Sequence, residues 1–196
     1  MVPLTAPSLI IDPQSGRISQ ARRLDSANWD ERPAEVAPEL IVVHGISLPP
    51  GEFGGPWIDR LFLNTLPPDA HPYFRHLEGA QVSAHVLIRR DGELVQYVAL
   101  HHRAWHAGRS SYQGRDRCND FSIGIELEGI DDLPYEHAQY RELARLIDTL
   151  CRTYSTLSRA RVMGHSDIAP GRKTDPGECF DWPRLRAMLA ALAPRC

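Results

Sequence analysis

The sequence lacks the features that would predict a membrane or nucleic-acid protein. It has no run of about 18 apolar residues, the length that a membrane-spanning helix needs. Residues 1–23 contain no basic segment followed by an apolar stretch, so we expect no secretory signal and a cytoplasmic protein. The net charge of −3 provides no basic field for nucleic acid. We therefore expect neither a membrane nor a nucleic-acid partner, and nothing in the sequence requires more than a monomer.

Cysteine is scarce and does not follow a metal-binding or disulfide pattern. The four cysteines form no CxxC pair and are spaced too widely for a small disulfide scaffold. We expect free thiols in a reducing compartment. Cys179 follows Asp175 by only a few positions, but we assign it no ligand role. The cysteines are Cys118, Cys151, Cys179 and Cys196.

What is present is an ordinary globular composition. Apolar residues make up 42% of the 196 positions and charged residues 24%, which is enough for one hydrophobic core. Residues 1–37 are rich in proline, aspartate and arginine and show little periodicity. We interpret them as an N-terminal arm, followed by a single domain over residues 38–196.

Local patterns predict both strands and helices. Strands are expected at 39–44, at 82–88 and 93–98 as a hairpin through Asp91-Gly92, at 121–127 and at 161–163. Helices are expected at 56–63, 136–154 and 182–192, with the segment 164–181 as a loop. This order predicts an α/β (α+β) fold with a central mixed sheet flanked by helices. The long loops 45–81 and 99–120 are typical of functional walls.

Two histidines and one aspartate are placed where a metal site is expected. His44 ends a predicted strand, His165 follows another, and Asp175 shares the loop of His165. Two imidazoles and a carboxylate suit Zn²⁺ with a fourth position open to water. Spacing alone supports this set only weakly, because no HExxH pattern is present and a single histidine is more often structural. His85 is the alternative ligand, and His106 is the best candidate for lining a cleft.

Charged residues near these ligands offer acid–base and electrostatic catalysis. Glu126 alternates away from the apolar face of its strand, and a carboxylate beside a metal can activate water. Glu128 shares that face, so the pattern equally allows either glutamate, or two solvated ones. Lys173 lies two residues before Asp175 and is either an oxyanion-stabilising cation or an ordinary surface lysine.

Several long runs, in order, resemble one enzyme family. The sequence is similar to the AmpD-type N-acetylmuramoyl-L-alanine amidases, the cytosolic 1,6-anhydro form. The runs include RAWHAG at 103–108, CNDFSIGIELEG at 118–129 and GHSDIAPGRKTDPG at 164–177. Others lie at 42–59, 82–85 and 88–93, so the resemblance covers most of the chain from about residue 40.

The resemblance implies a fold, a cofactor and a reaction. The fold would be that of the peptidoglycan recognition proteins. His44, His165 and Asp175 would hold zinc, Glu126 rather than Glu128 would be the catalytic carboxylate, and Lys173 would assist at the oxyanion. The substrate would be an anhydro-muropeptide, cleaved between the lactyl carbonyl of (1,6-anhydro)-N-acetylmuramic acid and L-Ala during peptidoglycan recycling.

Weaker expectations concern substrate contacts. Trp105 is a candidate wall for the sugar and peptide. Arg117 and Arg172 are candidates for pairing with peptide carboxylates, since a guanidinium fork matches that geometry. Members of the family usually carry Asn after the first metal histidine, where this chain has Gly45. One neutral hydrogen bond lost there would cost about 0.5–1.5 kcal/mol of affinity.

Two other functions fit the same residues. A muropeptide-binding protein without catalytic activity would share the fold but would typically lack a complete ligand set, which this chain retains. A zinc peptidase would cut within the stem peptide instead of releasing anhydro-muramic acid.

Overall fold

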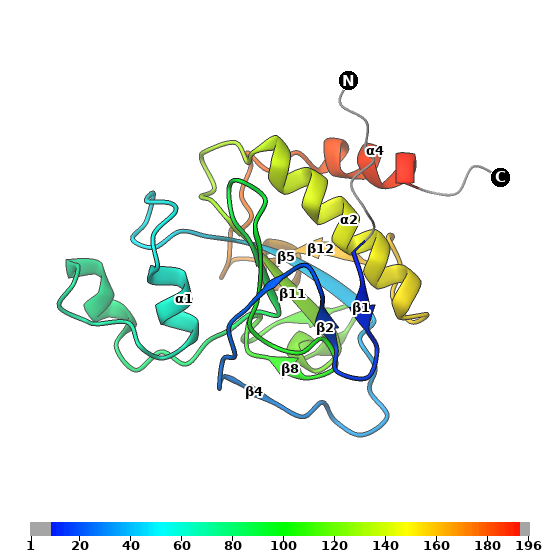
Figure 1. Ribbon diagram of the computed structural model, residues 1–196, viewed down its shortest axis with the longest axis horizontal. Coiled ribbons are helices and arrows are strands. Elements are labelled where there is room, and N and C mark those ends of the chain that lie inside the picture. Colours follow the sequence, from blue (N-terminus) through cyan, green and yellow to red (C-terminus); the bar gives the residue numbers. More distant parts are fainter. Residues whose placement is uncertain (1–8, 193–196) are drawn as a thin grey trace.

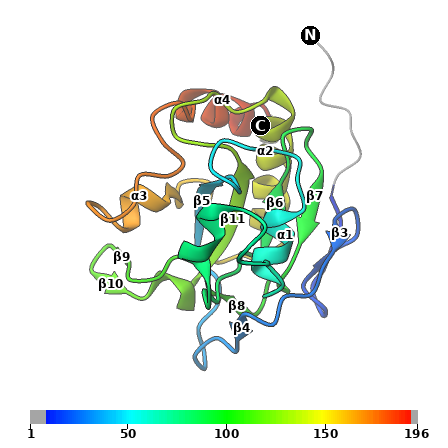
Figure 2. The ribbon, with the colours of Figure 1, turned by 90° about the vertical axis from the view of Figure 1, so that its left-hand side faces the viewer.

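A six-stranded mixed sheet forms the centre of the computed structural model, which describes residues 9–192. The strand order is β12-β5-β11-β6-β7-β3. Figure 1 labels β12, β5 and β11, and Figure 2 shows β5, β11, β6, β7 and β3 in turn. All neighbouring pairs are parallel except β6 and β7, which form the predicted hairpin. The predicted α/β (α+β) fold with one mixed sheet flanked by helices is therefore confirmed. The strands are β3 (Arg22–Arg23), β5 (Leu40–Ile46), β6 (Val86–Ile88), β7 (Leu94–Gln96), β11 (Ser122–Glu128) and β12 (Val162–Gly164).

The central strands β5 and β11 are buried along most of their length. Parallel strands covered on both faces tend to be apolar throughout, and the first four residues of β5 follow that rule. In β11, Ile123, Ile125 and Leu127 alternate with smaller or polar residues as predicted. The pairing register places Glu126 opposite His44, so two candidate site residues lie side by side at the carboxyl end of the sheet.

Helices α2 (His137–Thr153) and α4 (Trp182–Leu192) cover one face of the sheet, close to the bounds predicted from sequence (Figure 1). The apolar stripe of α2 is buried with the β11 isoleucines in one large core. Its first turn is closed by a capping box between Glu136 and Gln139. The amide of Gln139 also donates to the carbonyls of Ile88 and Glu128, which ties the helix to two strand ends.

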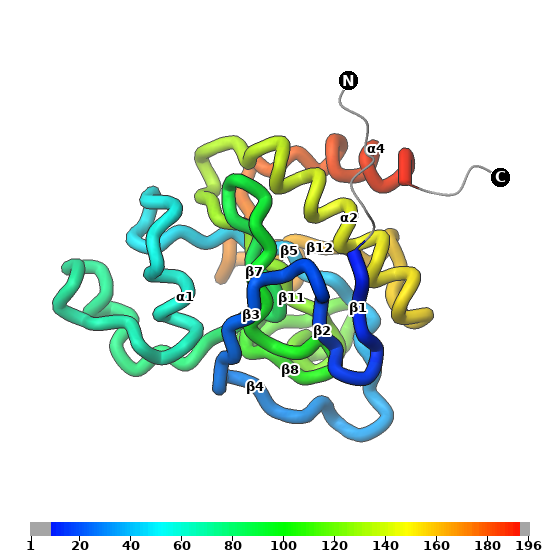
Figure 3. Tube along the Cα trace, viewed as in Figure 1, coloured from blue at the N-terminus to red at the C-terminus, as the bar shows by residue number. Residues whose placement is uncertain are grey.

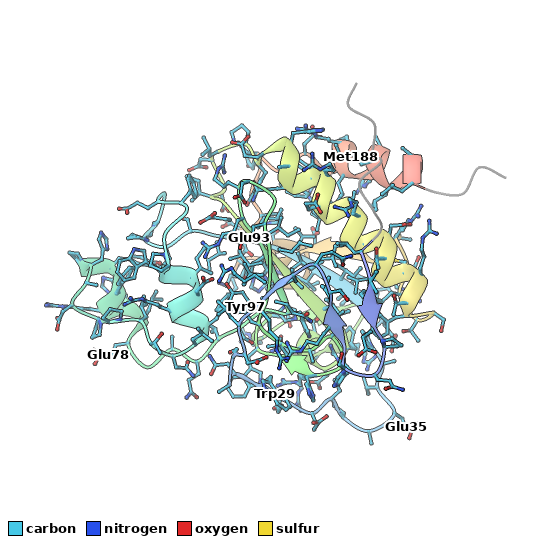
Figure 4. The ribbon with its side chains drawn as sticks, viewed as in Figure 1. Trp29, Glu35, Glu78, Glu93, Tyr97 and Met188 are labelled. Atoms are coloured by element: carbon cyan, nitrogen blue, oxygen red, sulfur yellow. The ribbon has the colours of Figure 1, made fainter. Side chains whose placement is uncertain are left out.

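The other face is covered by short helices and long loops. These are α1 (Trp57–Phe62), α3 (His165–Ile168) and the 3-10 turns η1 (Pro72–Leu77) and η2 (Cys118–Asp120). Figure 2 shows α1 and α3 on either side of β5 and β11. Tyr97, deep in the molecule (Figure 4), packs edge-on against Phe62 of α1 and donates its hydroxyl hydrogen bond to Asp59.

One expectation was wrong: the segment 164–181 is not entirely loop, because α3 begins at His165. The Asp167 carboxylate accepts the backbone N–H of Gly164 at 2.7 Å, which closes this four-residue helix at its start. A helix of one turn is too short to show a hydrophobic period.

The N-terminal segment runs along the domain as a series of two-residue strands, followed in blue in Figure 3. Its part before residue 9 lies outside the described residues. β1 (Ile11–Asp12) pairs with β2 (Arg17–Ile18), and β4 (Trp29–Asp30) pairs with β8 (Arg103–Ala104). β3 joins the edge of the main sheet beside β7. A second small ribbon is formed by β9 (Ser111–Tyr112) and β10 (Arg115–Asp116). Within residues 9–192, no helix has the length and apolarity to cross a membrane.

Candidate metal centre

The structure brings His44, His165 and Asp175 together at the carboxyl ends of the parallel strands. His44 lies near the end of β5, and His165 opens α3 directly after β12, the neighbour of β5. One ligand atom from each of the three residues lies within 4.8 Å of the others. Among the described residues, this is the only group of three or more such side chains that could hold a metal ion.

Three atoms converge at the centre of this group. His44 Nδ1 lies 2.9 Å from His165 Nδ1 and 3.2 Å from Asp175 Oδ2, and His165 Nδ1 lies 3.1 Å from the same oxygen. Both histidines are almost fully buried. Burial lowers the pKa of His44 to about 4, so its imidazole is neutral at pH 7 and free to act as a ligand. Two imidazole nitrogens and one carboxylate oxygen form a donor set that can hold a metal ion with one position left open.

Two hydrogen bonds to backbone carbonyls hold Asp175 and the next residue in place. Its backbone carbonyl accepts the N–H of Ser166 at 3.0 Å. The hydroxyl of Tyr135 donates to the carbonyl of Pro176 at 2.9 Å. These two contacts fix the Asp175 carboxyl group beside the two imidazoles.

Glu126 lies beside the metal group with an unpaired oxygen. It is 8% exposed, and its Oε2 atom has no hydrogen-bond partner among the described residues. Burial raises the pKa of Glu126 well above its usual range; the nearby Asp175 carboxylate raises it further, and Lys173 opposes them. A buried carboxyl group with a raised pKa and a free oxygen is suited to proton transfer.

Glu128 has a different environment on the same strand. It is 2% exposed and accepts hydrogen bonds from Gly54 N at 2.7 Å and from Arg89 Nη1 at 3.0 Å. The alternative of two solvated glutamates does not hold, because both side chains are buried. Glu128 joins the end of β11 to the glycine-rich loop 51–55, and its oxygens are already occupied.

A cavity of about 620 Å³ opens over the metal group. Lys173 and Trp105 line it together with Glu126. Trp105 is fixed by its indole Nε1–H, which donates to Asp30 Oδ1 at 3.1 Å. The predicted long loops do form its walls, since Leu48 and Tyr73 of loop 45–81 and His106 of loop 99–120 also line it.

The two arginines take different places. Arg172 lines the cavity, but its Nη2 donates to the carbonyls of Ala107 at 2.6 Å and Arg109 at 2.8 Å. The side chain of Arg117 is 72% exposed and pairs with Asp120 at 3.3 Å. It lines a separate cavity of about 430 Å³, on which Arg172 also borders. The structure therefore does not bring Arg117 into the metal cavity.

Of the two other histidine candidates, only His106 lies in the cavity. Both ring nitrogens of His85 are occupied, since Nδ1 accepts from Gly124 N at 2.9 Å and Nε2 lies 3.0 Å from the carbonyl of His102. His85 is thus no part of the metal group. His106 does line the cavity, and its Nδ1 lies 2.9 Å from His44 Nε2.

Sequence reasoning missed Tyr135, which has no motif around it. Its ring covers two glycines, because a Cβ atom at Gly45 would lie 2.3 Å from the hydroxyl oxygen and one at Gly129 would lie 2.4 Å from the ring. Gly45 therefore leaves room for the tyrosine that holds the Asp175 loop. The signal available in the sequence was the pair of glycines at two strand ends.

A His–His–Asp group at the carboxyl ends of parallel strands, with a buried carboxyl group beside it, is the arrangement of a metal-dependent hydrolase. Residues 34–178 match the family model described as N-acetylmuramoyl-L-alanine amidase. The chain belongs to this amidase family.

Similar proteins agree with that assignment. The 1,6-anhydro-N-acetylmuramyl-L-alanine amidase AmpD of Salmonella typhimurium (strain SL1344) is 60% identical over 178 residues, covering 91% of this chain and 95% of the relative. AmpD of Escherichia coli (strain K12) is 57% identical, covering 90% of this chain and 96% of its own. A crystal structure of a selenomethionine AmpD derivative superposes with a TM-score of 0.89 at 58% identity, covering 92% of this chain and 99% of that one. A Clostridium intestinale endolysin amidase at 16% identity shares the fold, with a TM-score of 0.62, and covers 89% of this chain and 98% of its own.

Proposed function

We propose that this protein hydrolyses the amide bond between the lactyl group of N-acetylmuramic acid, in its 1,6-anhydro form, and the L-Ala of the stem peptide. The observation that carries the proposal is the Glu126 carboxyl group, whose Oε2 has no hydrogen-bond partner in the described part of the chain, beside the three converging ligand atoms and under an open cavity. The relatives named AmpD, which match nearly the whole chain, carry this activity in their names.

Two structures of more distant relatives support the substrate class. AmpDh3 of Pseudomonas aeruginosa, 28% identical with a TM-score of 0.58, has been solved in complex with an anhydromuramic pentapeptide. AmiD of E. coli, also 28% identical, has been solved with anhydro-N-acetylmuramic acid-L-Ala-D-gamma-Glu-L-Lys. A cavity of about 620 Å³ is within the usual size for a site that binds a small ligand.

We propose zinc as the metal held by His44, His165 and Asp175. Magnesium and calcium favour all-oxygen sites, whereas two imidazole nitrogens with one carboxylate favour zinc. When bound, zinc supplies Lewis-acid chemistry, polarising a carbonyl and making water more acidic.

The protein's own residues supply the proton transfers. Glu126, as a carboxylate, accepts a proton from the water that attacks the lactyl carbonyl carbon. The carbon–nitrogen bond then breaks, and Glu126 returns the proton to the departing alanine nitrogen, leaving a free carboxylic acid and a free amine. The Lys173 ammonium group faces the same cavity and stabilises the oxygen that becomes negative in between.

Substrate contacts are proposed for three further side chains. Trp105, fixed by Asp30, forms a wall against which the sugar can pack. The exposed fork of Arg117 can pair with a peptide carboxylate beside the second cavity. Arg172 adds positive charge between the two cavities while it holds the turn at residues 107–109.

We also propose that the enzyme acts as a monomer in the cytoplasm. The described cysteines Cys118, Cys151 and Cys179 are all free thiols, as a reducing compartment favours. Size-exclusion chromatography with light scattering checks the monomer: a mass near 22.0 kDa is expected, and twice that value contradicts it.

Mass analysis of the products tests the proposed reaction. With 1,6-anhydro-N-acetylmuramoyl-tripeptide as substrate, we expect free 1,6-anhydro-N-acetylmuramic acid and an intact tripeptide. Cleavage inside the peptide would identify a peptidase instead. Binding of the muropeptide without any product would identify a binding protein on the same fold.

A further inference from the structure

A chain of hydrogen bonds leads from His44 away from the metal group into the sheet. His44 Nε2 lies 2.9 Å from His106 Nδ1, and His106 Nε2 lies 3.1 Å from Ser122 Oγ. Ser122 Oγ in turn lies 2.6 Å from the backbone carbonyl of Cys118. Ser122 and Cys118 are completely buried, so the far end of the chain has no contact with solvent.

We call the series His44–His106–Ser122 the histidine relay. The Cys118 carbonyl at its end determines which atom donates in each of its hydrogen bonds. A carbonyl oxygen only accepts, so Ser122 must use its single hydroxyl proton on Cys118. Towards His106 the hydroxyl can then only accept, so His106 carries its proton on Nε2. A neutral imidazole has one N–H, which leaves Nδ1 of His106 as an acceptor for the Nε2–H of His44. His44 Nδ1 is thereby left with a bare lone pair, and this is the atom that faces Asp175.

A single hydrogen bond to a backbone carbonyl orients the ring of His165. Its Nε2 lies 3.1 Å from the carbonyl of Ala107, which must accept its proton. Arg172 Nη2 also approaches this nitrogen, at 3.3 Å, but its two protons go to the carbonyls of Ala107 and Arg109. Nδ1 of His165 is therefore the bare nitrogen as well.

Gly124 of β11 leaves space for the His106 ring of the relay. A Cβ atom at Gly124 would lie 2.4 Å from His106 Cγ, so the imidazole rests directly on the β11 backbone. Ser122 and Glu126, two positions before and after Gly124, lie on the same face of the strand. One face of β11 thus carries both Ser122 of the relay and the Glu126 carboxyl group.

We propose that His106 and Ser122 are positioning residues that hold His44 in its Nε2-protonated tautomer and so present its Nδ1 lone pair to the metal before the metal binds. The inference rests on the metal centre of the proposed function. Metal-bound histidines usually donate their other N–H to a carboxylate, a carbonyl or water. Here a second imidazole takes that place, and a buried serine fixes its polarity.

Nuclear magnetic resonance of the histidine rings tests the proposal without any measurement of turnover. Long-range ¹⁵N–¹H correlation spectra of protein with ¹⁵N-labelled histidine distinguish the two tautomers. In metal-free protein at neutral pH, we expect His44 and His106 to be neutral and protonated at Nε2. A proton on Nδ1 of either ring overturns the proposal. An enzyme that failed to cleave muropeptides would leave this result unchanged, so the two proposals fail separately.

Substitution of Ser122 supplies the second test. In Ser122→Ala, we expect both tautomers at His106 and a zinc affinity reduced by about 10–100-fold, measured by competition with a chelator. Ser122→Thr keeps a hydroxyl and should restore most of the affinity. The control is Ser26→Ala, since Ser26 is also buried and donates to a backbone carbonyl, that of Phe62, but has no hydrogen bond to His44, His106 or His165.

The comparison between these variants decides the role. Equal zinc affinity in Ser122→Ala and Ser26→Ala overturns the proposal. If Ser122→Ala does not fold, the tautomers of the unsubstituted protein decide it alone.

Discussion

The two faces of the central sheet differ in what they bury. Towards α2 and α4, strand β11 presents Ile123, Ile125 and Leu127, which belong to the largest apolar core. Towards the loops, the same strand presents Ser122, Gly124, Glu126 and Glu128, which are equally buried. We call these the helix face and the loop face of the sheet. Burying polar groups costs free energy unless they are paired, so burial stabilises the loop face less than the helix face.

This difference separates stability from chemistry. The helix face provides area burial, which stabilises the fold without regard to detailed chemistry. On the loop face each β11 residue has its own role, since Ser122 ends the relay, Gly124 supports His106, and Glu128 anchors the loop 51–55. Glu126 is the exception, because its Oε2 has no hydrogen-bond partner among residues 9–192. We propose that the reaction uses this unsatisfied oxygen.

The largest expected effect comes from substituting the two glutamates of the loop face in turn. Glu126→Gln should lower kcat by roughly 10²–10⁴-fold with zinc retained, because the amide cannot accept the proton of water. Glu128→Gln should mainly lower the melting temperature, because it weakens the hold on Arg89 and Gly54. Steady-state kinetics, metal analysis and thermal unfolding of both variants measure kcat, zinc content and melting temperature. A dead Glu128→Gln beside an active Glu126→Gln would reverse the assignment.

Lys173 gives the next largest effect. Lys173→Met removes the cation from the cavity and should lower kcat by roughly 10²–10³-fold, the usual loss for one oxyanion-stabilising group. Lys173→Arg keeps the charge and should lose less. Kinetics on anhydro-muropeptide compare the two variants. Unchanged kcat in the Met variant would leave Lys173 as a surface lysine.

Substitutions on the helix face should lower stability and leave kcat unchanged. Ile147→Ala on α2 removes a fully buried side chain and should lower the free energy of unfolding by about 2–5 kcal/mol, with kcat unchanged below the melting temperature. Ile10→Ala, at a position that is 59% exposed, is the control and should change little. Denaturant unfolding gives the energies. A large loss of kcat in folded Ile147→Ala would mean that the faces are not separable.

The smallest effect is a pH dependence of the metal-free protein. Burial lowers the pKa of His85 to about 3 in the folded state, against about 6.5 when unfolded. Between these values the unfolded chain binds more protons, so stability is complete above about pH 6.5 and is lost as the pH falls. At about pH 5 this one histidine should cost about 2 kcal/mol relative to about pH 7.5.

His85→Asn checks that value, because the amide oxygen can still accept from Gly124 N. Chemical unfolding at about pH 5 and about pH 7.5 gives the change in the free energy of unfolding between the two pH values. In the variant this change should be smaller by about 2 kcal/mol. The same pH dependence in both proteins would show that His85 does not titrate on unfolding.

Much of the loop face could be predicted from sequence, but its polar network could not. Strand ends identified His44 and His165, although they are 121 residues apart, because parallel strands bring their carboxyl ends to one edge. The resemblance selected Glu126 over Glu128. The relay through His106 and Ser122 depends on a loop reaching a strand face, and no local pattern encodes that approach. The two-residue strands β1–β4 likewise have no alternation to detect.

Titration of metal-free protein with zinc, with products analysed on the same samples, is the decisive measurement for a zinc amidase. We predict that release of free 1,6-anhydro-N-acetylmuramic acid rises in proportion to added zinc and stops rising at about one zinc per chain, and that His165→Ala neither binds zinc at that site nor releases product. Full turnover in protein shown to hold no metal, or in zinc-free His165→Ala, would contradict the account.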